Sequence, residues 1–215
     1  MKETILVLIK FKISGNLRFL SHAETVKVFQ RACARTGMKI RHSRGFNPRP
    51  KLSLPLPRSV GVESDDDLLC LRVEDSASSF DGEQFKARLC EQLPEDCELL
   101  SAKVAEAKAL FQPSMAVYVL VVQEGYANEK LKTRIENLLA SESFNVQRRI
   151  NARGDTRNVD VRGFLKSIEL NDRNIAVECK ISSAGSIRVG EILKLLELDV
   201  ENLAAPVRRT SVEWN

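Results

Sequence analysis

Residues 16–58 read NLRFLSHAETVKVFQRACARTGMKIRHSRGFNPRPKLSLPLPR. No Asp or Glu occurs between Thr25 and Val62, although these two acids account for 29 of the 215 residues. The same window contains nine positive side chains, namely Lys27, Arg31, Arg35, Lys39, Arg41, Arg44, Arg49, Lys51 and Arg58. A long ordered segment with charge of one sign usually faces an anion, and phosphate is the commonest one. The stretch therefore predicts a surface that binds phosphate or nucleic acid.

Local signals divide this stretch into a helix, a strand and a loop. Residues 21–24 read SHAE, a capping box in which the Ser hydroxyl and the Glu carboxylate satisfy each other's backbone donors, so a helix should begin there. Gly37 should end it in a left-handed conformation. Met38–His42 is expected to be a short strand. Ser43–Pro57 contains four prolines, which predict a stiff loop and exclude regular helix or central sheet.

The rest of the first half supplies the partners of this helix. Residues 4–13, TILVLIKFKI, read as a central strand, and Leu17–Leu20 as a further extended piece. Two strand pieces, Ser59–Val62 and Leu68–Val73, should flank an acidic turn at residues 63–67. Residues 80–93 read as a helix and residues 97–104 as a last strand. The order strand, helix, strand, strand, helix, strand is that of a ferredoxin-like fold.

The second half follows a similar order after a boundary within residues 105–113. We expect strands at residues 115–123, 144–151, 174–181 and 207–214, helices at 128–140 and 188–196, and an inserted connection at 159–170. The sequence therefore predicts an α+β protein of two tandem ferredoxin-like (βαββαβ) units, 1–108 and 109–215, each with an antiparallel sheet covered by two helices.

The amino-acid composition is typical of a globular protein and not of a membrane or disulfide-rich protein. A hydrophobic fraction of 43% is enough to build a core, and the net charge of +4 is mild. Five cysteines without a C-x-x-C pair favour buried free thiols over disulfides or zinc. No apolar run reaches membrane-spanning length, and residues 5–9 are too short a run for a signal peptide. We expect a cytoplasmic protein without membrane contact.

Catalytic motifs are absent from the sequence. It contains no Gly-rich phosphate loop, no nucleophile elbow and no Cys or His cluster with metal-ligand spacing, so we assign no catalytic residue and no metal ligand. The two histidines are His22, in the first turn of the capped helix, and His42, between a strand and a loop. His22 is either a packed surface residue or an acid-base group, and His42 either touches a phosphate or ends its strand.

The basic stretch also has two interpretations. Lys27, Arg31 and Arg35 follow four-residue spacing, as on any solvated helix face. Continuity of one charge through helix, strand and loop favours binding instead, because guanidinium groups suit phosphate oxygens and exposed aromatics stack on single-stranded bases. The candidate RNA- or phosphate-binding residues are Arg18, His22, Arg41, Arg44, Phe46, Asn47, Arg49 and Lys51. A second and weaker basic group consists of Arg148, Arg149, Arg153, Arg157 and Arg162.

Three segments carry a resemblance to a known family: LRFLSHAE at residues 17–24, RACARTGM at 31–38 and SRGFNPRPKLSLPLPRSVGVES at 43–64. They resemble the radical-SAM-linked family of uncharacterised bacterial proteins, over roughly the first third of the chain. Three positions depart from that family's pattern: Glu24 replaces Asp, Ala34 replaces Arg, and Arg49 replaces His. The loss of that His weakens an acid-base role for the loop and leaves phosphate contact intact.

The resemblance implies an accessory to a radical SAM enzyme. The iron-sulfur cluster and SAM would belong to that partner, because this chain lacks the three-cysteine signature, and we expect no cofactor of its own. Our leading hypothesis is a non-catalytic RNA-binding or substrate-presenting protein for such an enzyme, in tRNA or rRNA modification. The alternatives are a metal-independent ribonuclease or transferase using His22, and a subunit that docks the radical SAM protein without RNA.

Overall fold

The computed structural model describes residues 4–149 and 154–215. It is a mixed α+β structure in which the chain divides into two compact units. Unit 1 consists of Met1–Gln112 together with Asn215, and unit 2 of Pro113–Trp214. The sequence had predicted a division between residues 108 and 109. No helix in the part of the chain that the structure describes combines the length and apolar character needed to cross a membrane.

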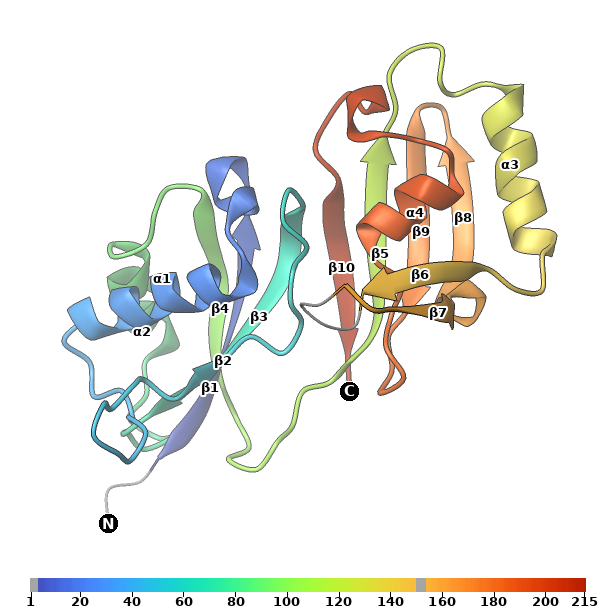
Figure 1. The fold of residues 1–215 in the computed structure, drawn as a ribbon. Helices are drawn as coiled ribbons and strands as arrows, with labels where there is room; N and C mark the ends of the chain where they lie inside the picture. The colour runs from blue at the N-terminus through green and yellow to red at the C-terminus, as the bar shows by residue number, and fades with distance from the viewer. Residues whose placement is uncertain (1–3, 150–153) are drawn as a thin grey trace. The chain divides into compact units, whose positions relative to one another are not determined.

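Unit 1 contains an antiparallel sheet in the order β4-β1-β3-β2 (Figure 1). Its strands are β1 (Ile5–Ile13), β2 (Leu52–Ser53), β3 (Glu63–Val73) and β4 (Cys97–Ala105). The central strand β1 is rich in β-branched and aliphatic residues, as a strand with two neighbours requires. Helices α1 (His22–Arg35) and α2 (Gly82–Cys90) cover one face of this sheet.

The core of unit 1 lies between the sheet and these two helices. Alternate residues of β1, from Ile5 to Ile13, are buried and pack with residues of α1 and α2. The rings of Phe11 and Phe29 meet edge to face with their centroids 4.7 Å apart. Because strand side chains alternate, Leu6 and its cross-strand partner Arg72 lie on the opposite sheet face, which neither helix covers.

The two ends of α1 follow the sequence prediction. The Ser21 backbone N–H donates to Glu24 Oε2 over 2.8 Å, and the Glu24 N–H donates to Ser21 Oγ over 3.4 Å. This capping box lowers the pKa of Glu24 through the hydrogen bonds from the Ser21 hydroxyl and backbone. Gly37 follows the helix with φ of 67°, a left-handed conformation that favours glycine.

Five local predictions for unit 1 were wrong. Ser59–Val62 is not a strand but a turn, in which the Val62 N–H donates to Ser59 O over 3.2 Å. Leu17–Leu20 is not extended, because Gly15–Phe19 forms a 3-10 helix, η1. Residues 63–67 are not a turn but the start of β3, since partners distant in the chain satisfy their acidic side chains. Met38–His42 makes only isolated bridges, from Ile40 to Val73 and from His42 to Pro50. The second strand is β2, inside the segment that was predicted to be all loop.

Unit 2 has a four-stranded antiparallel path in the order β10-β5-β9-β8. Its strands are β5 (Pro113–Val121), β8 (Leu165–Asn171), β9 (Asn174–Lys180) and β10 (Arg208–Trp214). Its helices are α3 (Glu129–Ala140) and α4 (Val189–Leu195), and two short 3-10 turns are η2 (Arg162–Phe164) and η3 (Val200–Asn202). Arg134 Nε of α3 donates to Leu195 O of α4 over 2.7 Å.

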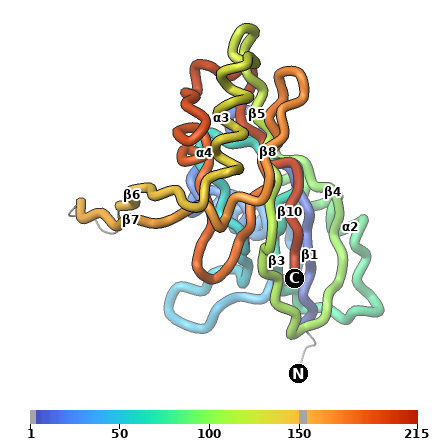
Figure 2. Tube along the Cα trace, turned by 90° about the vertical axis from the view of Figure 1, so that its right-hand side faces the viewer, coloured from blue at the N-terminus to red at the C-terminus, as the bar shows by residue number. Residues whose placement is uncertain are grey.

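A separate hairpin interrupts the order of unit 2. It consists of β6 (Asn145–Arg149) and β7 (Thr156–Asp160), and Figure 2 shows it extending away from the rest of the unit. The prediction had treated Val159–Leu170 as the inserted connection. That was wrong, because β8 lies there and pairs with β9. The predicted strand 144–151 ends beyond the described residues, at Ile150 and Asn151.

Candidate functional site: a basic loop and a cationic hollow in unit 1

The loop at residues 43–49, here called the loop tip, is closed at its base. The Ser43 backbone N–H donates to Arg49 O over 2.8 Å, and the Arg49 N–H donates to Ser43 Oγ over 3.0 Å. A bridge between His42 and Pro50 follows directly below. With Pro48 and Pro50 also restricting the backbone, the loop tip is ordered before any ligand arrives, which reduces the entropy cost of binding. Figure 2 shows this segment in light blue.

The side chains of the loop tip face solvent. Arg44, Asn47 and Arg49 are exposed, and the Phe46 ring is fully so, with a relative accessibility of 106%. An aromatic ring gains nothing for folding at such a position, because it removes no apolar surface from water. Between two arginines, it offers a stacking surface to an unpaired base while the guanidinium groups face phosphates.

Below the loop tip, a ring of three backbone hydrogen bonds gathers three cationic residues, Arg41, Lys51 and Arg72. The Arg41 N–H donates to Arg72 O over 2.9 Å, the Arg72 N–H to Lys51 O over 2.9 Å, and the Lys51 N–H to Arg41 O over 2.7 Å. These three residues, here called the cation ring, come from three segments of the chain. Their proximity is therefore set by rigid backbone and not by flexible side chains.

The two guanidinium groups of the cation ring are themselves anchored. Arg41 Nη1 donates to Thr4 Oγ1 over 2.7 Å, and Arg72 Nη1 donates to Ala107 O over 2.5 Å. Together with Thr4, the three cations line a hollow of about 350 Å³. Among the residues that line it, all within the described part of the chain, none is an acid. Within the described residues, the lining of the hollow therefore concentrates positive charge and includes no counterion.

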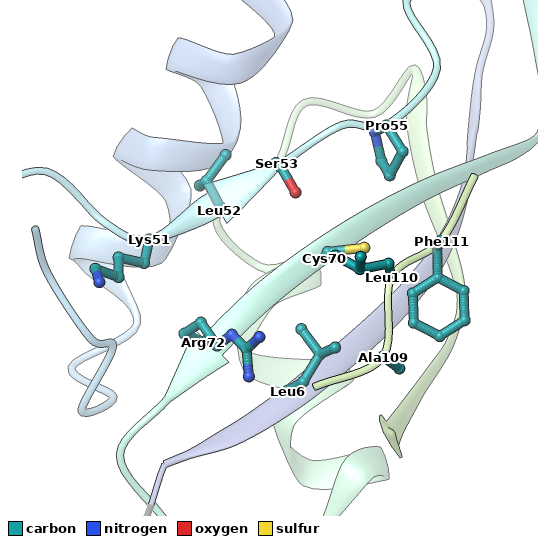
Figure 3. A pocket seen from close by; sticks show the side chains of 10 residues that line it. All are labelled: Leu6, Lys51, Leu52, Ser53, Pro55, Cys70, Arg72, Ala109, Leu110 and Phe111. Carbon is teal, nitrogen blue, oxygen red and sulfur yellow. The ribbon is translucent and has the colours of Figure 1, made fainter. Parts of the chain in front are cut away.

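A larger, mostly apolar pocket of about 420 Å³ adjoins this hollow and shares Lys51 and Arg72 with it (Figure 3). The segment from Ala109 to Phe111 passes over β1 and β3 and forms one wall. The other lining residues are Leu6, Leu52, Ser53, Pro55 and Cys70. This pocket lies on the sheet face that α1 and α2 leave uncovered.

Arg72 was missed by the sequence reasoning, although a signal was present. It is the only charged residue in the strand segment Leu68–Val73, and its neighbours Leu71 and Val73 are buried. Alternation along a strand places such a residue on the opposite face from its neighbours. Its proximity to Arg41 and Lys51, by contrast, depends on pairing that no local pattern reveals.

Arg18 and His22 lie away from the loop tip. Arg41 is bonded to Thr4 at the start of β1, whereas η1 and α1 follow its end, and a nine-residue strand is about 30 Å long. The Arg18 guanidinium donates to Gly15 O over 2.6 Å and stacks on the Phe19 ring at 4.3 Å. His22 lines a hollow of about 10 Å³, about the room that one water molecule needs.

Arg58 belongs to the same basic window but is buried. Its Nη1 donates to Arg18 O over 2.8 Å and to Val62 O over 2.5 Å, and its Nη2 donates to Leu17 O over 3.1 Å. Its Nε lies 4.0 Å from Asp67 Oδ2, and Ser64 Oγ donates to Asp67 Oδ1. We call this group the Arg58 network. It ties η1 to the start of β3, so this arginine holds the fold together.

The second basic group, in unit 2, is partly committed to internal contacts. Arg148 makes a bidentate pair with Glu191, at 2.8 and 2.7 Å, which raises the pKa of the arginine. Arg162 donates to the carbonyl oxygens of Leu139, Ser141 and Leu165. Arg153 lies outside the described residues. Internal bonding of this kind supports the earlier interpretation that this group is the weaker candidate.

The five cysteines are free thiols. Burial raises the pKa of Cys33, Cys97 and Cys179 to about 12, so these thiols are inert packing residues. The prediction of buried thiols was wrong for Cys90, which is exposed, and for Cys70, which is half-buried in the pocket of Figure 3. Within residues 4–149 and 154–215, no group of three or more His, Cys, Asp or Glu side chains is placed to hold a metal ion.

Comparison with known proteins yields one family. The family described as "Uncharacterized protein conserved in bacteria (DUF2344)" matches residues 7–193, which is most of the 215-residue chain. A search of curated proteins finds no match.

Proposed function

We propose that this chain, which belongs to that bacterial family, is a non-catalytic RNA-binding or substrate-presenting protein that serves a radical SAM enzyme. In this proposal the loop tip contacts RNA, with Phe46 stacking on a base and Arg44 and Arg49 on phosphates. The observation that carries it is the fully exposed Phe46 between arginines on a loop closed by its own hydrogen bonds. A tRNA or rRNA under modification is the proposed ligand.

The order of strands supports a fold suited to this role. Numbered within each unit, both sheets run fourth, first, third, second strand, once the β6–β7 hairpin is set aside as an insertion. We propose that the two units are two ferredoxin-like copies. RNA-binding modules built on a four-stranded sheet with two helices use the uncovered sheet face and nearby loops to contact single-stranded bases. In unit 1 the cation ring and the adjoining pocket lie on that face.

The test of the RNA part is a filter-binding titration of total tRNA. The double variant Arg44→Ala/Arg49→Ala should lose affinity, and the slope of log K against log salt should become shallower by about 1.4, since each cation on single-stranded RNA contributes about 0.7. A matched control, Lys27→Ala/Arg31→Ala, removes the same charge from the exposed face of α1. Equal losses in both variants would show general charge attraction and would contradict a role for the loop tip.

The radical SAM part rests on the sequence resemblance. Its test is copurification of the two proteins from cells, with and without nuclease treatment. Recovery of the partner in both samples, together with RNA binding by the chain alone, supports the proposal. Recovery of the partner with no RNA binding by the chain would favour the alternative, a docking subunit.

The ribonuclease or transferase alternative receives little support from the position of His22. The hollow beside it is too small for a phosphodiester, and apolar residues such as Phe11, Leu54 and Leu68 line it together with Arg58 and Asp67. Incubation of labelled RNA with the protein and a chelator decides between the two. Cleavage that disappears in His22→Ala would overturn the non-catalytic proposal.

A further inference from the structure

We infer that the cationic hollow and the adjoining pocket of unit 1 form one site for a nucleotide, with its phosphate at the cation ring and its base in the pocket. The inference deepens the proposed function and starts from it, because a terminal nucleotide of the bound RNA is one source of this ligand. A free mononucleotide is the other. The two sources share one chemistry, a phosphate joined through a sugar to a flat ring.

The cation ring favours a phosphate at its end of the site, because the described residues that line the hollow include three cations and no acid. Backbone hydrogen bonds hold the three cationic residues together and all three line one hollow, an arrangement that a bound anion would stabilise. Each arginine uses Nη1 for an internal acceptor, and those bonds fix the direction of its guanidinium plane. No further side-chain bond of Arg41, Lys51 or Arg72 occurs among the described residues, so their remaining donors are available to phosphate oxygens.

The mostly apolar lining of the pocket favours a flat ring at the other end of the site. Leu6 forms a buried floor, while Leu110 remains 80% exposed on the wall, in the segment that Arg72 anchors through Ala107. Figure 3 shows Phe111 and Pro55 toward one end of the pocket, with Lys51 and Arg72 toward the other. A volume of about 420 Å³ lies within the usual range for small-ligand sites. The Ser53 hydroxyl is a polar group that can orient a sugar or base.

The combination of the two ends favours a nucleotide over other anions. Three cations suit the double charge of a terminal phosphate better than the single charge of a carboxylate. Inorganic phosphate alone would leave the apolar wall without a partner. Because Lys51 and Arg72 line both spaces, one ligand can occupy them together.

The experiment is a titration of the 15N-labelled full chain with AMP, followed by amide NMR shifts. AMP should shift amides of residues 51–53, 70–72 and 109–111, with adenosine and inorganic phosphate each binding at least about tenfold more weakly. Lys51→Gln and Arg72→Gln should each weaken AMP binding by about tenfold or more. Lys51 is included because its exposed side chain makes no hydrogen bond or ion pair among the described residues, whereas Arg72 anchors Ala107.

The control variants separate this site from the loop tip. Lys27→Gln should leave AMP binding unchanged, and so should Arg44→Ala/Arg49→Ala, although the latter weakens RNA binding under the proposed function. If the loop-tip variant keeps full RNA affinity while AMP shifts the pocket amides, the proposed RNA contact fails and the nucleotide site stands. If RNA binds through the loop tip but AMP at up to about 10 mM shifts no pocket amide, the nucleotide site is overturned and the proposed RNA contact stands.

Short RNAs with and without a terminal phosphate distinguish the two sources. A loss of affinity on removing a 5′ or 3′ phosphate, abolished in Lys51→Gln, identifies the RNA terminus as the ligand. No effect of the terminal phosphates, together with AMP binding that depends on Lys51, identifies a free nucleotide. AMP binding that is unchanged in both Lys51→Gln and Arg72→Gln overturns the site.

Discussion

The Arg58 network and the cation ring contain positive residues from the same acid-free window, yet their surroundings are opposite. Arg58 is 8% exposed and is bonded to three backbone carbonyls beside Asp67. Arg41 and Lys51 meet Arg72, a third cation, and the described residues that line their hollow include no acid. The first arrangement satisfies its charge within the fold, whereas in the second no acid is found among the described lining residues.

This difference shows how the surroundings of a positive side chain indicate its role. A buried arginine with carbonyl and carboxylate acceptors is costly to remove because its partners are left unpaired. Like charges held together by backbone are expected where a ligand completes the site, since proteins tolerate local conflict mainly at functional positions. Separate measurements of stability and of binding, on variants of the Arg58 network and of the cation ring, test this contrast.

The largest expected effect is on stability, in Arg58→Met. Loss of the guanidinium leaves the carbonyls of Leu17, Arg18 and Val62 without these donors and leaves Asp67 buried, so we expect a loss of about 3–5 kcal/mol in the free energy of unfolding. Urea unfolding followed by circular dichroism measures it. Arg44→Met, at an exposed position, is the control and should leave the midpoint unchanged. A similar midpoint for both variants would contradict a structural role for Arg58.

The next effect is on RNA affinity, in Phe46→Ala. Base stacking on an aromatic side chain contributes about 1–3 kcal/mol, so affinity for single-stranded RNA should fall by about 5- to 150-fold with the salt slope unchanged. Filter binding at several salt concentrations checks both quantities. Because the ring is fully exposed, the unfolding midpoint should not move. Unchanged affinity would remove Phe46 from the proposed interface.

A smaller effect concerns the stability of the cation ring. Lys51→Gln removes one of three like charges, so we expect the protein to be equally stable or more stable by up to about 0.5 kcal/mol, mainly at low salt. Urea unfolding at low and high salt measures this. A clear loss of stability would show that Lys51, like Arg58, has a structural partner, and the contrast between the two places would disappear.

The smallest effect is the pH dependence of the α1 cap. The pKa of Glu24 is lowered from its ordinary value of 4.5 by the hydrogen bonds from Ser21. A lowered folded-state pKa means that the carboxylate stabilises the fold above pH 4.5 and that this contribution is lost as pH falls through the folded value. Wild type should therefore be slightly more stable than Glu24→Gln at neutral pH, and the gap should close in acid. Urea midpoints across a pH series measure the gap, and a gap that stays constant would contradict the capping role.

Features that depend on a few neighbouring residues were predictable. The ends of α1 follow from a Ser and a Glu three residues apart and from a Gly after the last turn, because a cap is completed within one turn. β1 follows from an apolar run. The exposure of the loop tip also agrees with its prolines and polar residues.

Features that depend on distant partners were not predictable. Residues 63–67 resemble a turn by composition, but β3 begins there because Gly15 donates to Glu63 and Lys10 pairs with Asp66. β2 is only two residues long and exists because Leu71 and Cys70 supply its partners. The β6–β7 hairpin was not predicted, because the pairing of two strands has no signature within either strand alone.

The sequence alone determined that one stretch of the chain carries positive charge without acid, begins in a capped helix and ends in a proline-stiffened loop, since charge, caps and proline restraint are local properties. Only the tertiary structure decided which of those cations is bonded inside the fold and which line one hollow together. The physical reason is that the acceptors of Arg58 and the third member of the cation ring, Arg72, arrive through contacts between segments far apart in the chain.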